Sequence, residues 1–209
     1  MDGRLASNLS RPLVAALALW VSSGVQAGGI DHAVDAGDAT GIFKRNYQLA
    51  LQDVVPLVVI GTALWQGDDS RLGHNAWQAT DSLLIGEVTA AAMKVAFTRA
   101  RPSQSNDSGR WFQGAGHYSF PSGEVMEITT AVTPFILEYG AEHPAVWALG
   151  LLPVYDAIAR VRSQAHWQTD VLASLVIGTG IGYYAHSRPT SLTVGLLPRG
   201  ITIGWKKSF

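Results

Sequence analysis

Three residues in the last third of the chain have types and spacing suited to nucleophilic chemistry: Arg160, His166 and Asp170. His166 and Asp170 are four positions apart, so on a helix they share one face and lie close enough to interact. A carboxylate that orients an imidazole prepares it to act as a nucleophile or a base. Arg160 adds a planar cation whose donors match phosphate oxygens. The segment 160–170 therefore suggests a histidine-based site for an anionic group.

Two further cations, Lys94 and Arg101, lie upstream in a helical pattern that extends from about Asn75 to Arg101 and is ended by Pro102. Seven residues make about two turns, so both side chains should project from one face, roughly 10 Å apart along the axis. The apolar residues around Lys94 predict a partly buried ammonium group that needs an anionic partner. Arg99, in contrast, is expected to be a solvated surface charge.

Ser122 and Gly123 follow Pro121 at the predicted start of the next helix, which should continue to about Tyr139. The free N–H groups and the positive end of a helix bind anions, and the serine hydroxyl adds a donor. Glycine lets a ligand approach the backbone closely. Residues 103–119, which precede this helix, show no periodicity, and loops of this length inside a compact domain are usually functional.

In this order, the segments Lys94-x6-Arg101-Pro102, Pro121-Ser122-Gly123 and Arg160-x5-His166-x3-Asp170 resemble the tripartite signature of the type-2 phosphatidic acid phosphatase superfamily. That superfamily includes lipid phosphatases, class A acid phosphatases and vanadium haloperoxidases, and the resemblance covers about residues 75–186. It implies that His166 attacks phosphorus and forms a phosphohistidine, and that Asp170 holds the imidazole. It also implies a set of phosphate-binding residues, without a metal or other cofactor: Lys94, Arg101, Ser122, Gly123 and Arg160.

The sequence departs from the family pattern at Ala159, where a serine is usual, and at Glu124, where the family has its general-acid histidine. In one interpretation Glu124 replaces that histidine as the acid–base group. A phosphate dianion and burial would raise its pKa, whereas the neighbouring cations would lower it. If the pKa is raised, activity should peak at acidic pH. Alternatively, His117 in the preceding loop lends the proton, or is an ordinary loop histidine near the phosphate entrance.

Two other interpretations of Glu124 need no acid. A diphosphate expels a phosphate monoester, which is a far better leaving group than an alkoxide, so lipid or polyprenyl diphosphates could be the substrates. In the third interpretation catalysis is impaired and the protein only binds phosphate. Haloperoxidase activity is disfavoured, because it relies on the histidine that Glu124 replaces.

The elements that must position these groups are predicted to be helices, which makes the fold all-α: a compact helical bundle with a short C-terminal β-hairpin. The apolar stretches, such as Val54–Trp65 with Pro56 at a helix start or kink, are short or carry charges and are expected to be buried in a soluble domain. The apolar segment 42–65 should contain a helix that starts or kinks near Pro56, further helices should cover about 75–101, 121–139, 145–162 and 167–186, and the hairpin should cover 191–205.

The N-terminus has the basic, apolar and small-residue regions of a secretory signal peptide, with cleavage after Ala27. The mature chain, 28–209, is then one domain, periplasmic or secreted. The net charge of −1 gives no field that would favour nucleic acid. We therefore expect an exported phosphatase for phosphate esters or diphosphates, with lipid-linked substrates favoured and soluble phosphoesters left open. Contact with a membrane surface is a further option, through the terminal segment 205–209 for example.

Overall fold

The computed structural model of the protein describes residues 29–34 and 41–190, and this part of the chain is all-α, as predicted. The predicted hairpin over 191–205 and the predicted signal peptide lie outside the described residues. The described elements, with η marking 3-10 helices, are η1 (Gly41–Phe43), α2 (Arg45–Gln66), α3 (Arg71–Phe97), α4 (Gly123–Tyr139), η2 (Pro144–Gly150), α5 (Leu151–Arg162) and α6 (Gln168–His186).

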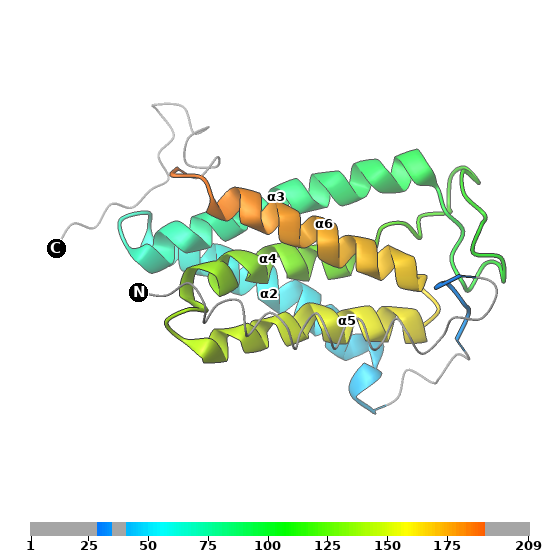
Figure 1. Ribbon diagram of the computed structural model, residues 1–209, viewed down its shortest axis with the longest axis horizontal. Helices are drawn as coiled ribbons and strands as arrows, with labels where there is room; N and C mark the ends of the chain where they lie inside the picture. Colours follow the sequence, from blue (N-terminus) through cyan, green and yellow to red (C-terminus); the bar gives the residue numbers. More distant parts are fainter. Residues whose placement is uncertain (1–28, 35–40, 191–209) are drawn as a thin grey trace.

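The helices lie lengthwise beside one another, with α4 in contact with all four of the others (Figure 1). Two glycines of α6 allow its closest approach to α4. A Cβ atom on Gly178 would lie 2.9 Å from Thr129 Cβ, and one on Gly182 would lie 2.5 Å from Thr133 Cβ. Both threonine hydroxyls donate to carbonyl oxygens one turn back in α4, which satisfies them inside the bundle. The N-termini of α4 and α6 are thereby fixed side by side.

The chain direction alternates so that one end of the bundle collects the residues predicted to do chemistry. The helices α2, α4 and α6 begin there, and α3 and α5 end there, at the right of Figure 1. The long loop between α3 and α4 covers the same end. As predicted, α4 begins directly after Ser122, although the serine side chain makes no capping hydrogen bond.

The prediction that one helix carries both Lys94 and Arg101 was wrong, because α3 ends at Phe97. Thr98 has left-handed backbone dihedrals (φ 34°), and its N–H still donates to the Lys94 carbonyl. The loop then folds back on the helix end, where the Phe112 and Gln113 N–H groups donate to the carbonyls of Phe97 and Thr98. Arg101 therefore comes from the loop, and the left-handed turn had no signal in a sequence free of glycine at that point.

The prediction that the apolar stretch Val54–Trp65 is buried was also wrong. Only Gln48, Val59 and Ala63 of α2 are buried, whereas Leu57 is 71% and Trp65 87% exposed. Pro56 lies inside the helix rather than at its start. Periodicity cannot separate a helix buried in protein from one with a free apolar face.

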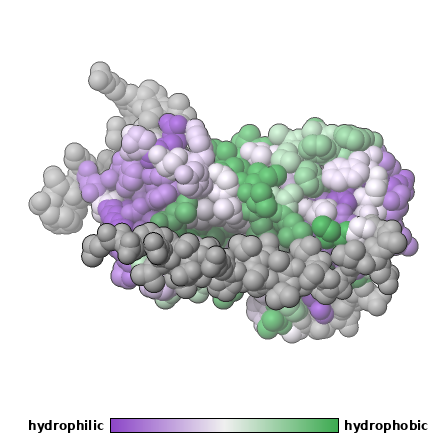
Figure 2. All heavy atoms as spheres, in the orientation of Figure 1, coloured by the Kyte–Doolittle hydropathy of each residue, from purple (hydrophilic) through white to green (hydrophobic). Residues whose placement is uncertain are grey.

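Hydrophobic residues also lie on the surface of α3 and α6, where Leu84, Val88, Val95 and Val176 are each more than half exposed (Figure 2). Two helical segments, Arg45–Gln66 and Pro144–Arg162, are long and apolar enough to cross a membrane, and α2 is the less buried of the two. Core helices of soluble proteins share that length and composition.

Candidate active site

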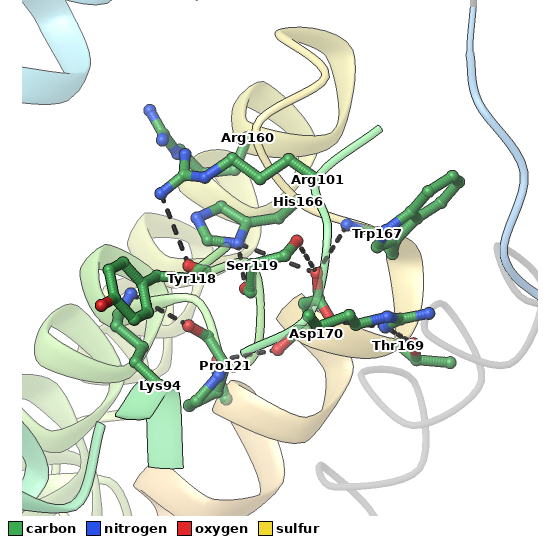
Figure 3. A network of polar contacts seen from close by, with 12 residues as sticks. Lys94, Arg101, Tyr118, Ser119, Pro121, Arg160, His166, Trp167, Thr169 and Asp170 are labelled. Carbon is green, nitrogen blue, oxygen red and sulfur yellow. Dashed lines mark hydrogen bonds and ion pairs between the residues drawn. The ribbon is translucent and has the colours of Figure 1, made fainter. Parts of the chain in front are cut away.

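The buried imidazole of His166 is held by the backbone before α4 and by the start of α6. Its Nδ1 lies 2.6 Å from the Ser119 carbonyl oxygen and 3.8 Å from Asp170 Oδ2 (Figure 3). Since a carbonyl can only accept, Nδ1 carries the proton and Nε2 keeps its lone pair. The predicted pairing of His166 with Asp170 is therefore present as a close contact, while the hydrogen bond itself goes to Ser119.

Asp170 organises the residues around His166. Its Oδ2 accepts from the Ser119 hydroxyl at 2.5 Å and from the Trp167 N–H at 2.8 Å, so the carboxylate also caps α6. Although burial opposes ionisation, these donors, His166 and Arg99 keep the pKa of Asp170 below its ordinary value. The carboxylate thus fixes the serine whose carbonyl holds the imidazole.

Arg99 is part of the site and is not the surface charge that its sequence position suggested. It is 2% exposed, and its guanidinium donates to Asp170 Oδ1 at 2.5 Å and to Asp31 Oδ2 at 2.6 Å. Asp31 also accepts from Thr169, at the start of α6. Because the left-handed turn at Thr98 redirects the chain, Arg99 points inward, where it ties Asp31 to the carboxylate behind His166.

Burial lowers the pKa of His166 to about 4 although the neighbouring Asp170 carboxylate raises it, and the positive charges of Arg160 and Arg101 add to the lowering. The imidazole is therefore neutral at physiological pH. Figure 3 shows the side chains of Arg101 and Arg160 beside this ring, with Lys94 near Pro121. A neutral imidazole with a free Nε2 among cations is an arrangement for attack on an anionic electrophile.

Lys94 reaches the N-terminus of α4, where its Nζ donates to the Pro121 carbonyl at 3.1 Å. Burial, followed by the charge of Arg101, lowers the pKa of Lys94. A Cβ atom on Gly123 would lie 3.4 Å from Nζ, about van der Waals contact, so the ammonium group lies directly beside the start of α4. Ser122 is fully buried, and its hydroxyl has no hydrogen-bond partner in the described part of the chain. Lys94, Ser122 and Gly123 thus lie together at the start of α4, and their predicted role in phosphate binding stays a prediction.

Arg101 and Arg160 lie beside the His166 ring and are, with Lys94, the predicted phosphate-binding cations. Arg101 makes a long hydrogen bond of 3.5 Å to the Tyr118 carbonyl. Arg160 is buried, and its Nη1 lies 3.3 Å from Gln48 Oε1 and 3.5 Å from Glu124 Oε1. Its Nε has no partner among the residues described. As far as the structure describes the chain, the side chains of Lys94 and Arg101 therefore donate only to backbone carbonyls, and Arg160 keeps an unpaired Nε–H donor besides its contact with Glu124.

Glu124 is paired with an arginine that sequence reasoning missed. Arg45, the first residue of α2, donates to Glu124 Oε2 at 2.6 Å and to Oε1 at 3.0 Å. Burial raises the pKa of Glu124, but the hydrogen bonds from Arg45 and the positive charges of Arg160 and Arg45 bring it below its ordinary value. The sequence left open whether the pKa of Glu124 is raised or lowered, and in the structure it is lowered. Glu124 is a carboxylate, and an acidic activity peak does not follow from its pKa.

His117 lies half-buried in the loop, and its Nδ1 has no hydrogen-bond partner in the described residues. Its auxiliary role stays a prediction. Within residues 29–34 and 41–190, no group of three or more His, Cys, Asp or Glu side chains is arranged to hold a metal ion.

The three motifs and this geometry agree with a comparison against known families: the model of the PAP2 superfamily matches residues 75–192, more than half of the chain. The protein belongs to the PAP2 superfamily. It is also similar to a lipid A 1-phosphatase of Porphyromonas gingivalis, with 30% identity over 102 residues. That match covers 48% of this chain and 20% of the relative, so the chain spans only about a fifth of the relative's length. No solved structure matches the chain.

Proposed function

We propose that the protein is a phosphatase that removes a terminal phosphoryl group through a phosphohistidine at His166. The observation that carries the proposal is the state of that imidazole. It is buried, neutral and bound through Nδ1–H to Ser119, so Nε2 presents a lone pair beside Arg101 and Arg160. Neutral imidazole is the form of histidine that attacks phosphorus.

The cations supply the stabilisation that phosphoryl transfer needs. Negative charge spreads over the equatorial oxygens in the transition state, and fixed donors that face them lower the barrier. Lys94, Arg101 and Arg160, with Ser122 and the Gly123 amide at the start of α4, provide these donors. Asp170 and Arg99 position other residues rather than the phosphoryl group, since they hold Ser119 and the start of α6 in place.

The ionised state of Glu124 favours substrates whose leaving group needs no proton. A carboxylate with a lowered pKa is a poor general acid at neutral pH, but it can accept a proton from water. We assign Glu124 to the second step, in which water attacks the phosphohistidine. The first step then requires a leaving group such as the phosphate monoester released from a diphosphate.

The substrate class that we propose is lipid-linked. The relative from Porphyromonas gingivalis is named for a lipid phosphate. In this chain, the exposed apolar face of α2 continues from Arg45 at the site toward Trp65 at the far end. A lipid surface against this face would cover the exposed leucines and bring the headgroup to the site end of the bundle. The signal-like segment 1–27 supports export to the surface where such lipids occur.

A substrate panel tests the proposed function. Farnesyl diphosphate, farnesyl phosphate and glycerol 3-phosphate are compared at pH 5 to 8 by phosphate release. We expect hydrolysis of the diphosphate with a kcat/KM roughly 100-fold above that of the monophosphate, which is the lower end of the contribution that general acid catalysis usually makes. Equal rates on the two farnesyl substrates would contradict the leaving-group argument. If none of the three substrates is hydrolysed, the protein is better described as an anion-binding protein than as a phosphatase.

Charges placed on the apolar face of α2 should weaken membrane association. Leu57 and Leu64 are 71% and 59% exposed and lie two turns apart on one face. Burial of a leucine in an apolar phase contributes roughly 1.5–3 kcal/mol, so Leu57→Glu and Leu64→Glu should each reduce binding to lipid vesicles at least about tenfold in flotation assays. Leu151→Glu, at an equally exposed leucine of α5, is the control. Equal binding by all variants would exclude this face as the contact surface.

A further inference from the structure

Besides its pair with Glu124, Arg45 is linked to the site through Gln48, which lies one turn further along the same helix, α2. Its Nη1 donates to Gln48 Oε1 at 3.2 Å, and the same oxygen accepts from Arg160 Nη1 at 3.3 Å. Gln48 is fully buried, and its amide donates to the Phe43 carbonyl at 2.9 Å. One oriented glutamine therefore links Arg45 to the arginine beside His166.

Arg45 lies at the open edge of the site. Its side chain is 41% exposed, whereas those of Glu124, Arg160 and His166 are 13%, 8% and 2% exposed. The exposure thus increases from the imidazole outward through the Glu124 carboxylate to Arg45. In-line displacement places the leaving group opposite the nucleophile. Because His166 is at the closed side, the leaving group must point to the open edge, where Arg45 stands.

Arg45 keeps donors for a ligand, because its hydrogen bonds within the described residues, to Gln48 and Glu124, use three of the five N–H groups of its guanidinium. Four cations, Lys94, Arg101, Arg160 and Arg45, lie around Glu124. Of the other acids near them, Asp170 is paired with Arg99, and Glu87 lies on the side of Lys94. Asp156, the other acid near Arg160, is fully buried, and burial together with the charge of Glu124 raises its pKa to about 7. It therefore stays largely protonated below that pH and adds little negative charge. A single phosphoryl group at His166 engages the inner cations and leaves the remaining N–H donors of Arg45 unused at the exposed edge.

We infer that Arg45 binds a second anionic group on the leaving side of the substrate, so that it selects diphosphates over monophosphates. This inference rests on the proposed function. His166 Nε2 forms a bond to the terminal phosphorus, the bond from that phosphorus to the bridging oxygen breaks, and the bridging oxygen leaves with the electron pair as part of a phosphate monoester. No proton is consumed, and the charge that develops on the leaving phosphate faces the Arg45 guanidinium.

The test is the ratio of kcat/KM for farnesyl diphosphate to kcat/KM for farnesyl phosphate. Arg45→Gln should lower this ratio at least tenfold, and Arg45→Lys should restore part of it. Arg71→Gln is the matched control. Arg71 is also half-exposed and paired with glutamates, Glu138 and Glu142, but it lies at the other end of α3. A loss of equal size on both substrates would show that Arg45 serves only to hold Glu124, and would overturn the inference.

A binding measurement separates this inference from the proposed function. Calorimetric titration with methylenediphosphonate and with methylphosphonate needs no turnover. Wild type should bind the diphosphonate more tightly than the monophosphonate, and Arg45→Gln should abolish most of that difference while Arg71→Gln keeps it. If no substrate is hydrolysed but this pattern is found, the proposed function fails and the assignment of Arg45 stands. An unchanged difference in Arg45→Gln overturns the assignment even if the enzyme is active.

Discussion

Replacement of His166 by alanine is expected to lower kcat by roughly 10⁴- to 10⁶-fold, as removal of a nucleophile does in enzymes with covalent intermediates. The cations and the start of α4 remain, so substrate binding should weaken far less than turnover. The measurement is kcat and KM on farnesyl diphosphate. His143→Ala, an exposed histidine between α4 and η2, is the control and should keep wild-type rates. A His166→Ala variant with more than about a tenth of the wild-type kcat would exclude His166 as the nucleophile.

The same residue sets the expected pH dependence. The neutral imidazole is the reactive form, and the pKa of His166 in the free enzyme is lowered to about 4. The neutral fraction therefore increases as the pH rises through about 4 and is complete at neutral pH. The kcat/KM value reports ionisations of the free enzyme. Its acidic limb should therefore follow His166 and reach a plateau above about pH 5. A limb near pH 6.5 would indicate an imidazole exposed to water.

The second large effect is expected at Glu124. Glu124→Gln keeps the shape of the side chain but removes the base that accepts a proton from water, so the steady-state kcat should fall roughly 10²- to 10⁴-fold. Because the first step needs no acid with a diphosphate, the variant should still release one equivalent of farnesyl phosphate in a fast burst. Rapid-quench kinetics measures the burst and the slow phase separately.

The control for Glu124→Gln is Glu138→Gln, because Glu138 also pairs with an arginine but lies far from His166. It should leave both phases unchanged. If Glu124→Gln lost the burst as well, Glu124 would have to act before or during the first step, as a general acid that replaces the family's histidine. A Glu124→Gln variant with the wild-type kcat would show that Glu124 has no role in catalysis.

The sequence was sufficient to predict the positions of residues whose surroundings are defined by their neighbours along the chain. His166 and Asp170 meet because they flank the start of one helix, and Ser122 and Gly123 stand at a helix start because Pro121 precedes them. The helical fold followed from periodicity in the same way. Lys94, in its apolar stretch, was correctly expected to be partly buried.

The residues that the sequence did not reveal depend on long-range packing. Arg45 meets Glu124 from 79 positions away, and Arg99 meets Asp170 across 71 positions. Arg99 also points inward only because Thr98 takes a left-handed conformation, which its residue type does not favour. The basic pair Lys44-Arg45 before the apolar stretch of α2 was a weak signal for Arg45, and Asp31 gave none.

The most direct test of the account is to trap the covalent intermediate. Wild type and Glu124→Gln are mixed with farnesyl diphosphate labelled in its terminal phosphate, quenched in alkaline detergent, and mapped by mass spectrometry. The account predicts a phosphoryl group on His166, stable in base and labile in acid, that accumulates to near one equivalent in Glu124→Gln. Release of phosphate without any covalent label, or a label on another residue such as His117, would contradict it.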